Sequence, residues 1–216
     1  MAKNTAWHDD DWLLLMQKYL QKPVGVKPLY SRPMVELSME LHIAPQVLQS
    51  KMQQIARLDT PRIERIWQTY SQNPRRLTRA VSLLRGMKGF GAPNDFYEGV
   101  EVEETFEKDF RPLPENPRYT PVMLILILDL FFRLTPATMV TETPEVQELA
   151  KLIKQMPLKV VEVMDIFQHC DPYLNRKDTV NSPLSKPCRE IWRRYGNTET
   201  EQLATYAEQL KEYFKS

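Results

Sequence analysis

Glycine, cysteine and histidine are scarce in this chain. It has 6 glycines against 17 prolines in 216 residues, which indicates helices with stiff connections and weakens the case for a glycine-rich loop that cradles phosphate. Only two cysteines are present, and the N-terminus has no apolar signal core. We therefore expect a cytoplasmic protein with reduced thiols and no cofactor.

No stretch is apolar for long enough to span a membrane. The most apolar run, residues 122–134, contains Asp129 and Arg133 and is shorter than the roughly 20 apolar residues that a transmembrane helix needs. This run is predicted to form a buried helix, and no membrane partner is expected.

Residues suited to metal binding or catalysis are few and scattered. The three histidines are His8, His42 and His169. His169, Cys170 and Cys188 could supply three zinc ligands, but they lack paired short spacings and an evident fourth ligand. The acidic residues 9–11 could bind a hard cation, although the start of a helix explains them better. Because no Ser/His/Asp or paired-carboxylate signature is evident, we predict no metal site and no enzymatic activity.

The net charge of +1 conceals an uneven distribution of charge. Residues 1–90 carry 14 Lys and Arg against 7 Asp and Glu, residues 91–119 carry 3 against 8, and residues 120–216 carry 12 against 13. Basic character is therefore confined to the first part of the chain, which is where nucleic acid would bind.

An internal repeat organises the chain. A single offset aligns residues 14–55 with residues 126–167 without a gap and places Pro45 on Pro157. A larger offset then aligns two IW..Y motifs, at residues 66–70 and 191–195, so the second copy contains an insertion between residues 167 and 191. Matched prolines and matched IW..Y motifs exceed what chance similarity between amphipathic helices readily produces.

The repeat predicts an all-α fold made of two tandem copies of a five-helix unit. The first, basic copy covers residues 1–88, and the second covers residues 120–216. Between them, residues 89–119 are acidic and contain proline and glycine, as expected of a linker, with a short strand or turn at residues 100–102. Apolar spacing places the helices of the first copy at residues 12–20, 34–42, 45–57, 61–71 and 74–87.

A helix-turn-helix motif is predicted at residues 34–55. A short helix ends near His42, and Pro45 can occupy the first position of the next helix, so the two helices must cross at a large angle. Glutamine matches the paired donor and acceptor of adenine, and Ser and Lys can meet phosphates or base edges. The second helix would present the following side chains to DNA: Gln46, Gln49, Ser50, Lys51 and Gln53.

The chain also resembles a known module. The motifs are DDDWLLLMQKYL after Trp7, ELSMELHIAPQVLQSKM and IWQTY in the first copy, and HCDP and IWRRY in the second. They are similar to the helical module found upstream of HNH nuclease domains in some bacterial proteins. The first copy departs from that module by having LDTP at residues 58–61 in place of the Asp-Pro phrase. The resemblance implies DNA binding, and the histidines and asparagines that an HNH nuclease needs around its metal are missing.

The second copy has a different helix in the place of residues 46–53. Its sequence there is LKVVEVMD, in which Glu162 and Asp165 would repel phosphate and most of the remaining surface is apolar. We therefore expect the second copy to pack against the first or to form a homodimer contact. The apolar side chains concerned are Val160, Val161, Val163 and Met164.

The last helix of the first copy carries arginines at an unfavourable place. Arg75 and Arg76 lie in its first turn, where cations oppose the helix dipole. The matching helix of the second copy has acids there, and Thr198 and Glu201 can form a capping box. An anion bound there would turn this unfavourable charge–dipole interaction into a favourable one. Arg75, Arg76 and Arg79 are therefore predicted to clamp the nucleic-acid backbone beside the helix of residues 46–53.

Two hypotheses follow from these patterns. The first is a regulator-like protein, such as one used in transcription regulation, that binds double-stranded DNA with its first helix-turn-helix. The alternative is a non-enzymatic protein-interaction scaffold in which both helix-turn-helix units serve packing. Binding to mixed duplex DNA that weakens steeply with salt would distinguish the first from the second.

Overall fold

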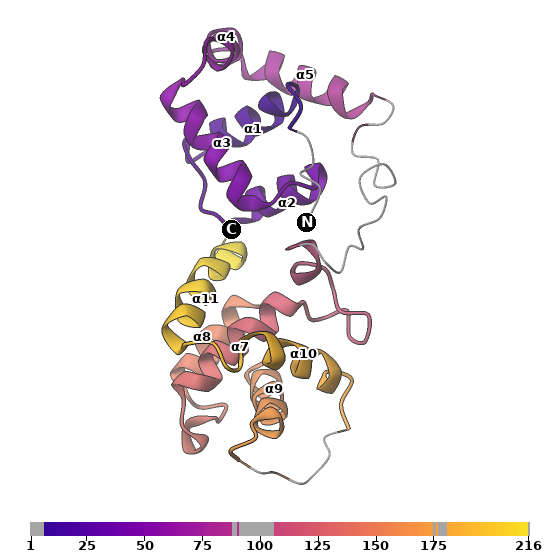
Figure 1. Cartoon of the computed structure of the whole chain (residues 1–216), viewed down its shortest axis with the longest axis vertical. Coiled ribbons are helices and arrows are strands. Elements are labelled where there is room, and N and C mark those ends of the chain that lie inside the picture. The colour runs from indigo at the N-terminus through magenta and orange to yellow at the C-terminus, as the bar shows by residue number, and fades with distance from the viewer. Residues whose placement is uncertain (1–6, 88–89, 91–105, 175, 177–180, 216) are drawn as a thin grey trace. The chain divides into compact units, whose positions relative to one another are not determined.

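The computed structural model describes residues 7–87, 90, 106–174, 176 and 181–215. Within these residues it has ten α-helices and no strand, which confirms the predicted all-α class. The chain divides into two compact units, Met1–Thr105 (unit 1) and Phe106–Lys215 (unit 2), both drawn in Figure 1. None of the described helices is long and apolar enough to cross a membrane.

Unit 1 is built around its first helix. α1 packs against all four other helices of the unit, and its inward side chains Leu14, Leu15 and Met16 are fully buried. Four of the five helices have proline in the first turn, where its missing N–H and fixed φ cost nothing. The helices are α1 (Asp11–Leu20), α2 (Arg32–Leu41), α3 (Pro45–Arg57), α4 (Pro61–Tyr70) and α5 (Pro74–Arg85).

A short turn joins α2 to α3 where the sequence predicts the turn of a helix-turn-helix. His42 adopts the left-handed conformation with φ 55°, and the amide of Ile43 donates to Ser38 O at 3.1 Å, which ends α2. Ala44 is then the N-cap and Pro45 the first residue of α3. The short turn makes α2 and α3 neighbours, and they pack against each other.

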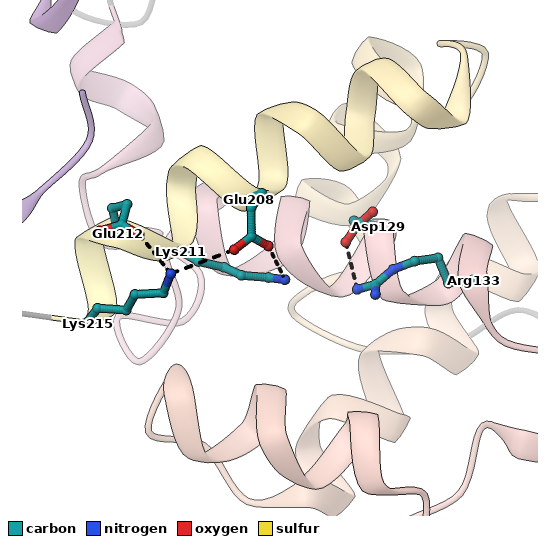
Figure 2. Close-up of polar contacts among 6 residues, drawn as sticks. All are labelled: Asp129, Arg133, Glu208, Lys211, Glu212 and Lys215. Atoms are coloured by element: carbon teal, nitrogen blue, oxygen red, sulfur yellow. Dashed lines mark hydrogen bonds and ion pairs between the residues drawn. The ribbon is translucent and has the colours of Figure 1, made fainter. Parts of the chain in front are cut away.

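Unit 2 is built around the most apolar helix of the chain. α7 packs against α8, α9, α10 and α11, and the burial predicted for its apolar run is confirmed. Asp129 is buried in this helix and pairs with Arg133 at 2.8 Å, as Figure 2 shows. The elements are the 3-10 helices η2 (Phe106–Asp109) and η3 (Pro136–Thr138), with α7 (Pro121–Arg133), α8 (Pro144–Leu152), α9 (Pro157–Cys170), α10 (Ser185–Tyr195) and α11 (Thr200–Lys215).

The apolar surface of α9 is covered within unit 2. Val160, Val163 and Met164 are buried and Val161 is half-buried, because α9 packs against α7, α8 and α10 of its own unit. The expectation that these side chains need the first copy or a second molecule therefore loses its basis. A single unit already removes them from water.

The predicted linker is too long at its C-terminal end. Residues 106–119 belong to unit 2, where η2 packs against α7 and both Phe110 and Tyr119 are buried. Composition alone missed this packing because Asp109 binds Arg194, which is 85 residues further along the chain. Residues 100–102, for which a strand or turn is predicted, lie outside the described residues.

Helix order and spacing agree between the two units, while the tandem duplication itself stays a prediction. The offset that places Pro45 on Pro157 also places the start of α2 on that of α8 and the start of α3 on that of α9. The same offset aligns His42 with Lys154, and both residues have φ 55°. The connection from α9 to α10 is longer than that from α3 to α4, as the predicted insertion requires.

The start of α11 differs from the prediction. The helix begins at Thr200, and the amide of Gln202 donates to Glu199 O at 3.0 Å. Glu199 therefore precedes the helix as its cap, and the Gln202 side chain donates to Glu199 Oε2 at 3.0 Å. The predicted capping box of Thr198 and Glu201 is wrong because the helix starts one residue later than it requires.

Candidate nucleic-acid interface

The first two turns of α5 present three arginines to solvent. α5 begins at Pro74 as predicted, and its buried side chains Leu77, Val81 and Leu84 form one face. Because the helix packs against α1 and α4, this face is turned inward. The guanidinium groups lie on the exposed residues Arg75, Arg76 and Arg79.

These arginines lack the carboxylate partners that several other cations of unit 1 have. Arg62 pairs with Asp9 at 3.1 Å, and Arg85 makes a two-point contact with Glu40 at 2.5 and 2.8 Å. The Glu40 hydrogen bond raises the pKa of Arg85. Arg75, Arg76 and Arg79 form no ion pair with any residue that the structure describes.

The start of α5 leaves its positive end unneutralised. Asn73 is the N-cap, but its side chain accepts no capping hydrogen bond, and the first turn contains no acid. Arg76 lies over the ring of Tyr70 with its guanidinium carbon 5.6 Å from the centroid, which holds that side chain near the helix start. Amide groups and cations therefore gather at one place that favours an anion.

The outer face of α5 changes from basic to apolar along its length. A shallow surface depression follows this face, and Arg75, Thr78 and Arg79 line its basic end. Leu83 lines the other end and is 67% exposed, and the neighbouring Met87 is 61% exposed. The basic end suits phosphate, whereas the apolar end does not.

On α3, three of the five predicted DNA-binding side chains make contacts within unit 1. Gln46 Nε2 donates to the Tyr30 hydroxyl at 2.9 Å, and Gln49 Nε2 donates to Lys27 O at 3.3 Å. The ammonium of Lys51 lies 5.3 Å from the ring centroids of both Trp7 and Trp12. Gln46 is exposed despite its contact, as are the remaining two residues, Ser50 and Gln53.

Unit 1 has two further exposed cations that the sequence did not predict as part of an interface. Arg57 in the last turn of α3 and Arg65 on α4 are exposed, and neither forms an ion pair with a described residue. α4 packs against both α3 and α5. The one available signal was that both arginines lie on helix surfaces without an acid four residues away.

α3 and α5 share two neighbouring helices, α1 and α4. α3 packs against α1, α2 and α4, whereas α5 packs against α1 and α4. The main packing contacts of α5 thus place it one helix away from α3, rather than directly against it as the predicted clamp assumed. Phosphates bound by α5 would belong to a different stretch of backbone from bases that face α3.

The residues considered as metal ligands lie near the start of α1 and, in unit 2, at His169, Cys170 and Cys188. Among the described residues, no three His, Cys, Asp or Glu side chains are grouped as metal ligands. Asp11 accepts a hydrogen bond from the His8 amide at 2.8 Å at the start of α1, and burial raises the pKa of its carboxyl. Burial also raises the pKa values of Cys170 and Cys188, so neither thiol is activated.

No family model, curated protein or solved structure matches this chain. The resemblance to the module upstream of HNH nuclease domains therefore stays a prediction. The geometry of the described residues supplies the support for a function.

Proposed function

We propose that unit 1 binds double-stranded DNA by holding its phosphate backbone, as part of a regulator-like, cytoplasmic, non-enzymatic protein. The observation that carries the proposal is the arginine group of α5. Arg75, Arg76 and Arg79 are exposed, form no ion pair with a described residue and lie in the first two turns of a helix whose first turn has no acid. Charge-assisted bonds from arginine to phosphate are among the stronger contacts a surface can make.

The short turn between α2 and α3 supports the same proposal. It sets α3 against α2 with Val47, Ser50 and Gln53 exposed, which is the side a duplex could approach. Phosphate contacts fix the position of a protein on DNA, and a helix of a helix-turn-helix can then enter the major groove. The excess of Lys and Arg over Asp and Glu in residues 1–90 favours approach of a polyanion.

A protein-interaction scaffold is the second candidate. Leu83 and Met87 are largely exposed at the apolar end of α5, and exposed apolar groups of this size can contact a protein partner. This candidate does not use the unpaired arginines, so charge reversal at the start of α5 separates the two.

The proposal is tested with the full chain and a labelled mixed-sequence duplex of about 20 base pairs, roughly two helical turns. Fluorescence polarisation at low salt should show binding, and the double variant R75E/R76E should bind at least about tenfold more weakly, because two phosphate contacts become repulsive. The matched control R189E/R193E changes the net charge equally on exposed residues of unit 2 and should bind almost normally.

Two outcomes would contradict the proposal. One is a lack of binding at low salt by the folded wild-type chain. The other is an equal loss of affinity in both double variants, which would show that only the net charge of the chain matters. Circular dichroism of each variant verifies that its helix content is unchanged.

A further inference from the structure

We infer that unit 1 recognises the DNA backbone without reading base sequence, an inference that rests on the proposed function. The reason lies in the connection between α1 and α2, residues 21–31. This connection forms hydrogen bonds with Gln46 and Gln49, two of the side chains that the sequence predicts to read bases.

Three contacts hold the connection on α3. The Gln46 side chain donates to Tyr30, the Gln49 side chain donates to Lys27 O, and the amide of Lys27 lies 3.2 Å from Met52 Sδ. Positions 46 and 49 are helix neighbours, as are 49 and 52, so the contacts follow α3 from the exposed Gln46 to the buried Met52. The connection therefore contacts α3 over two turns and binds a side-chain N–H of both Gln46 and Gln49, while Gln46 remains an exposed residue.

The connection is itself anchored and cannot easily move away. Tyr30 is 6% exposed, and Lys27 is equally buried. The Lys27 ammonium donates to the carbonyls of Gln21 and Pro23, with the Gln21 contact at 2.6 Å. Desolvation lowers the pKa of this ammonium, which has backbone carbonyls as its neighbours. Displacing the connection would expose these groups and break their hydrogen bonds.

Reading adenine requires both the nitrogen and the oxygen of a glutamine side chain. Gln46 and Gln49 would have to give up intramolecular hydrogen bonds to do so. Lys51, the third candidate, lies against Trp7 and Trp12. Between positions 46 and 53, the exposed residues of α3 are Gln46, Val47, Ser50 and Gln53, and Gln46 among them is bound to Tyr30.

The hydrogen bonds between the connection and α3 do not affect the proposed contacts to phosphate. Arg75, Arg76 and Arg79 lie on α5, whose main packing partners are α1 and α4. The three arginines are exposed, so a duplex can reach them without moving the connection. Phosphates are the same at every base pair, so these contacts confer affinity and no sequence preference.

The test is competition between a labelled duplex and unlabelled duplexes of equal length but unrelated sequence, including AT-rich and GC-rich ones, with the full chain. We expect all competitors to displace the label within about tenfold of one another, whereas sequence-specific proteins prefer their site by about a thousandfold or more. A preference of that size for one duplex, or a motif enriched from a random library, would overturn the inference.

Variants of Gln46 and Gln49 sharpen the test. Q46A/Q49A should bind every duplex within about twofold of wild type and should unfold at a lower temperature, because it loses two internal hydrogen bonds. A changed rank order of duplexes in this variant would contradict the inference. Absence of binding to any duplex by the wild type removes the proposed function and this inference with it, whereas strong binding with sequence preference removes the inference alone.

Discussion

The last helices of the two units, α5 and α11, carry charges of opposite sign in their first turns. α11 has Glu201 in its first turn and Lys215 in its last, an arrangement that suits the helix dipole. α5 has arginines in its first turn and no acid. The charges of α11 therefore suit its dipole, whereas the first-turn charges of α5 oppose it.

Charges along α11 are also satisfied within the helix. Glu208 pairs with Lys211 at 2.7 Å and with Lys215 at 3.7 Å, and Glu212 pairs with Lys215 at 2.7 Å, a chain of contacts visible in Figure 2. Lys211 lowers the pKa of Glu208. These exposed pairs contribute little each, but they leave few charges open to a partner.

Buried charges show the same contrast between the units. In unit 2, Asp109 and Asp129 are buried and each pairs with an arginine, Arg194 and Arg133. In unit 1, buried Asp11 accepts a hydrogen bond from a backbone amide and is not paired with a described cation. The buried carboxylates Asp109 and Asp129 of unit 2 are thus neutralised by arginine, whereas that of Asp11 in unit 1 is held by an amide.

The largest effect is expected from the aromatic core of unit 2. Phe167 is fully buried, and its ring centroid lies 6.2 Å from the ring centroid of Phe131 and 6.4 Å from that of Trp192. The substitution F167A should lower the free energy of unfolding of unit 2 by roughly 3–5 kcal/mol, because it removes a large buried side chain and leaves a cavity. The predicted equivalent in unit 1, Ile55, should cost somewhat less when changed to Ala.

Chemical denaturation followed by circular dichroism measures both changes. Since the two units have separate cores, F167A should move the transition of unit 2 and leave that of unit 1 in place. A loss below about 1 kcal/mol would show that the aromatic cluster does not hold unit 2 together.

A smaller loss is expected when the buried ion pair of unit 2 is broken. Arg194 donates to both oxygens of Asp109 at 2.7 Å, and this hydrogen bonding raises the pKa of the guanidinium. R194A should reduce the stability of unit 2 by about 3 kcal/mol, because Asp109 stays buried without its partner. The variant R194A/D109N should recover part of the loss. Equal stability of the single and double variants would contradict this account.

Exchange of charge at the two helix starts tests the comparison of α5 with α11 directly. Arg75 and Glu201 both occupy the second helical position. R75E should raise the stability of unit 1, and E201R should lower that of unit 2, each by roughly 0.3–1 kcal/mol. The melting temperature of each unit should move in the same direction. R75E would then weaken DNA binding while stabilising the fold. A destabilised R75E would mean that the arginine is structural.

The smallest effect concerns the buried carboxyl of α1. Because burial raises the pKa of Asp11 above its ordinary value, the folded state holds the proton more tightly than the unfolded state. The stability due to this group is highest below the ordinary pKa of Asp and falls as the pH rises through the raised pKa. D11N should remove this fall, so the stability difference between D11N and wild type should depend on pH in that window. A constant difference from pH 3 to pH 7 (about four pH units) would contradict the assignment.

The sequence predicts the helices well because their signals are local. α3 extends over Pro45–Arg57, the predicted bounds, since apolar spacing and the first-turn proline lie within the helix itself. α5 likewise begins at the predicted Pro74. The exposure of Arg75 and Arg76 also follows from the spacing of the buried positions around them.

What the sequence could not predict depends on contacts between distant residues. Gln46 and Gln49 were expected to face DNA, but their partners lie in the connection before α2, 16 and 22 residues away. The packing of residues 106–119 depends on Arg194 in the same way. The spacing of polar residues identifies the outer side of a helix, but it does not indicate which loop those side chains bind.

The salt dependence of binding tests most directly whether the α5 arginines, which form no ion pair with a described residue, hold DNA phosphates. Three phosphate contacts predict that the logarithm of the association constant falls with the logarithm of salt concentration with a slope of about −2.7, which is about a 40-fold loss between roughly 50 and 200 mM salt. R75E/R76E should reduce the magnitude of this slope by about 2. Binding by wild type that does not weaken with salt, or an unchanged slope in the folded double variant, would contradict the claim.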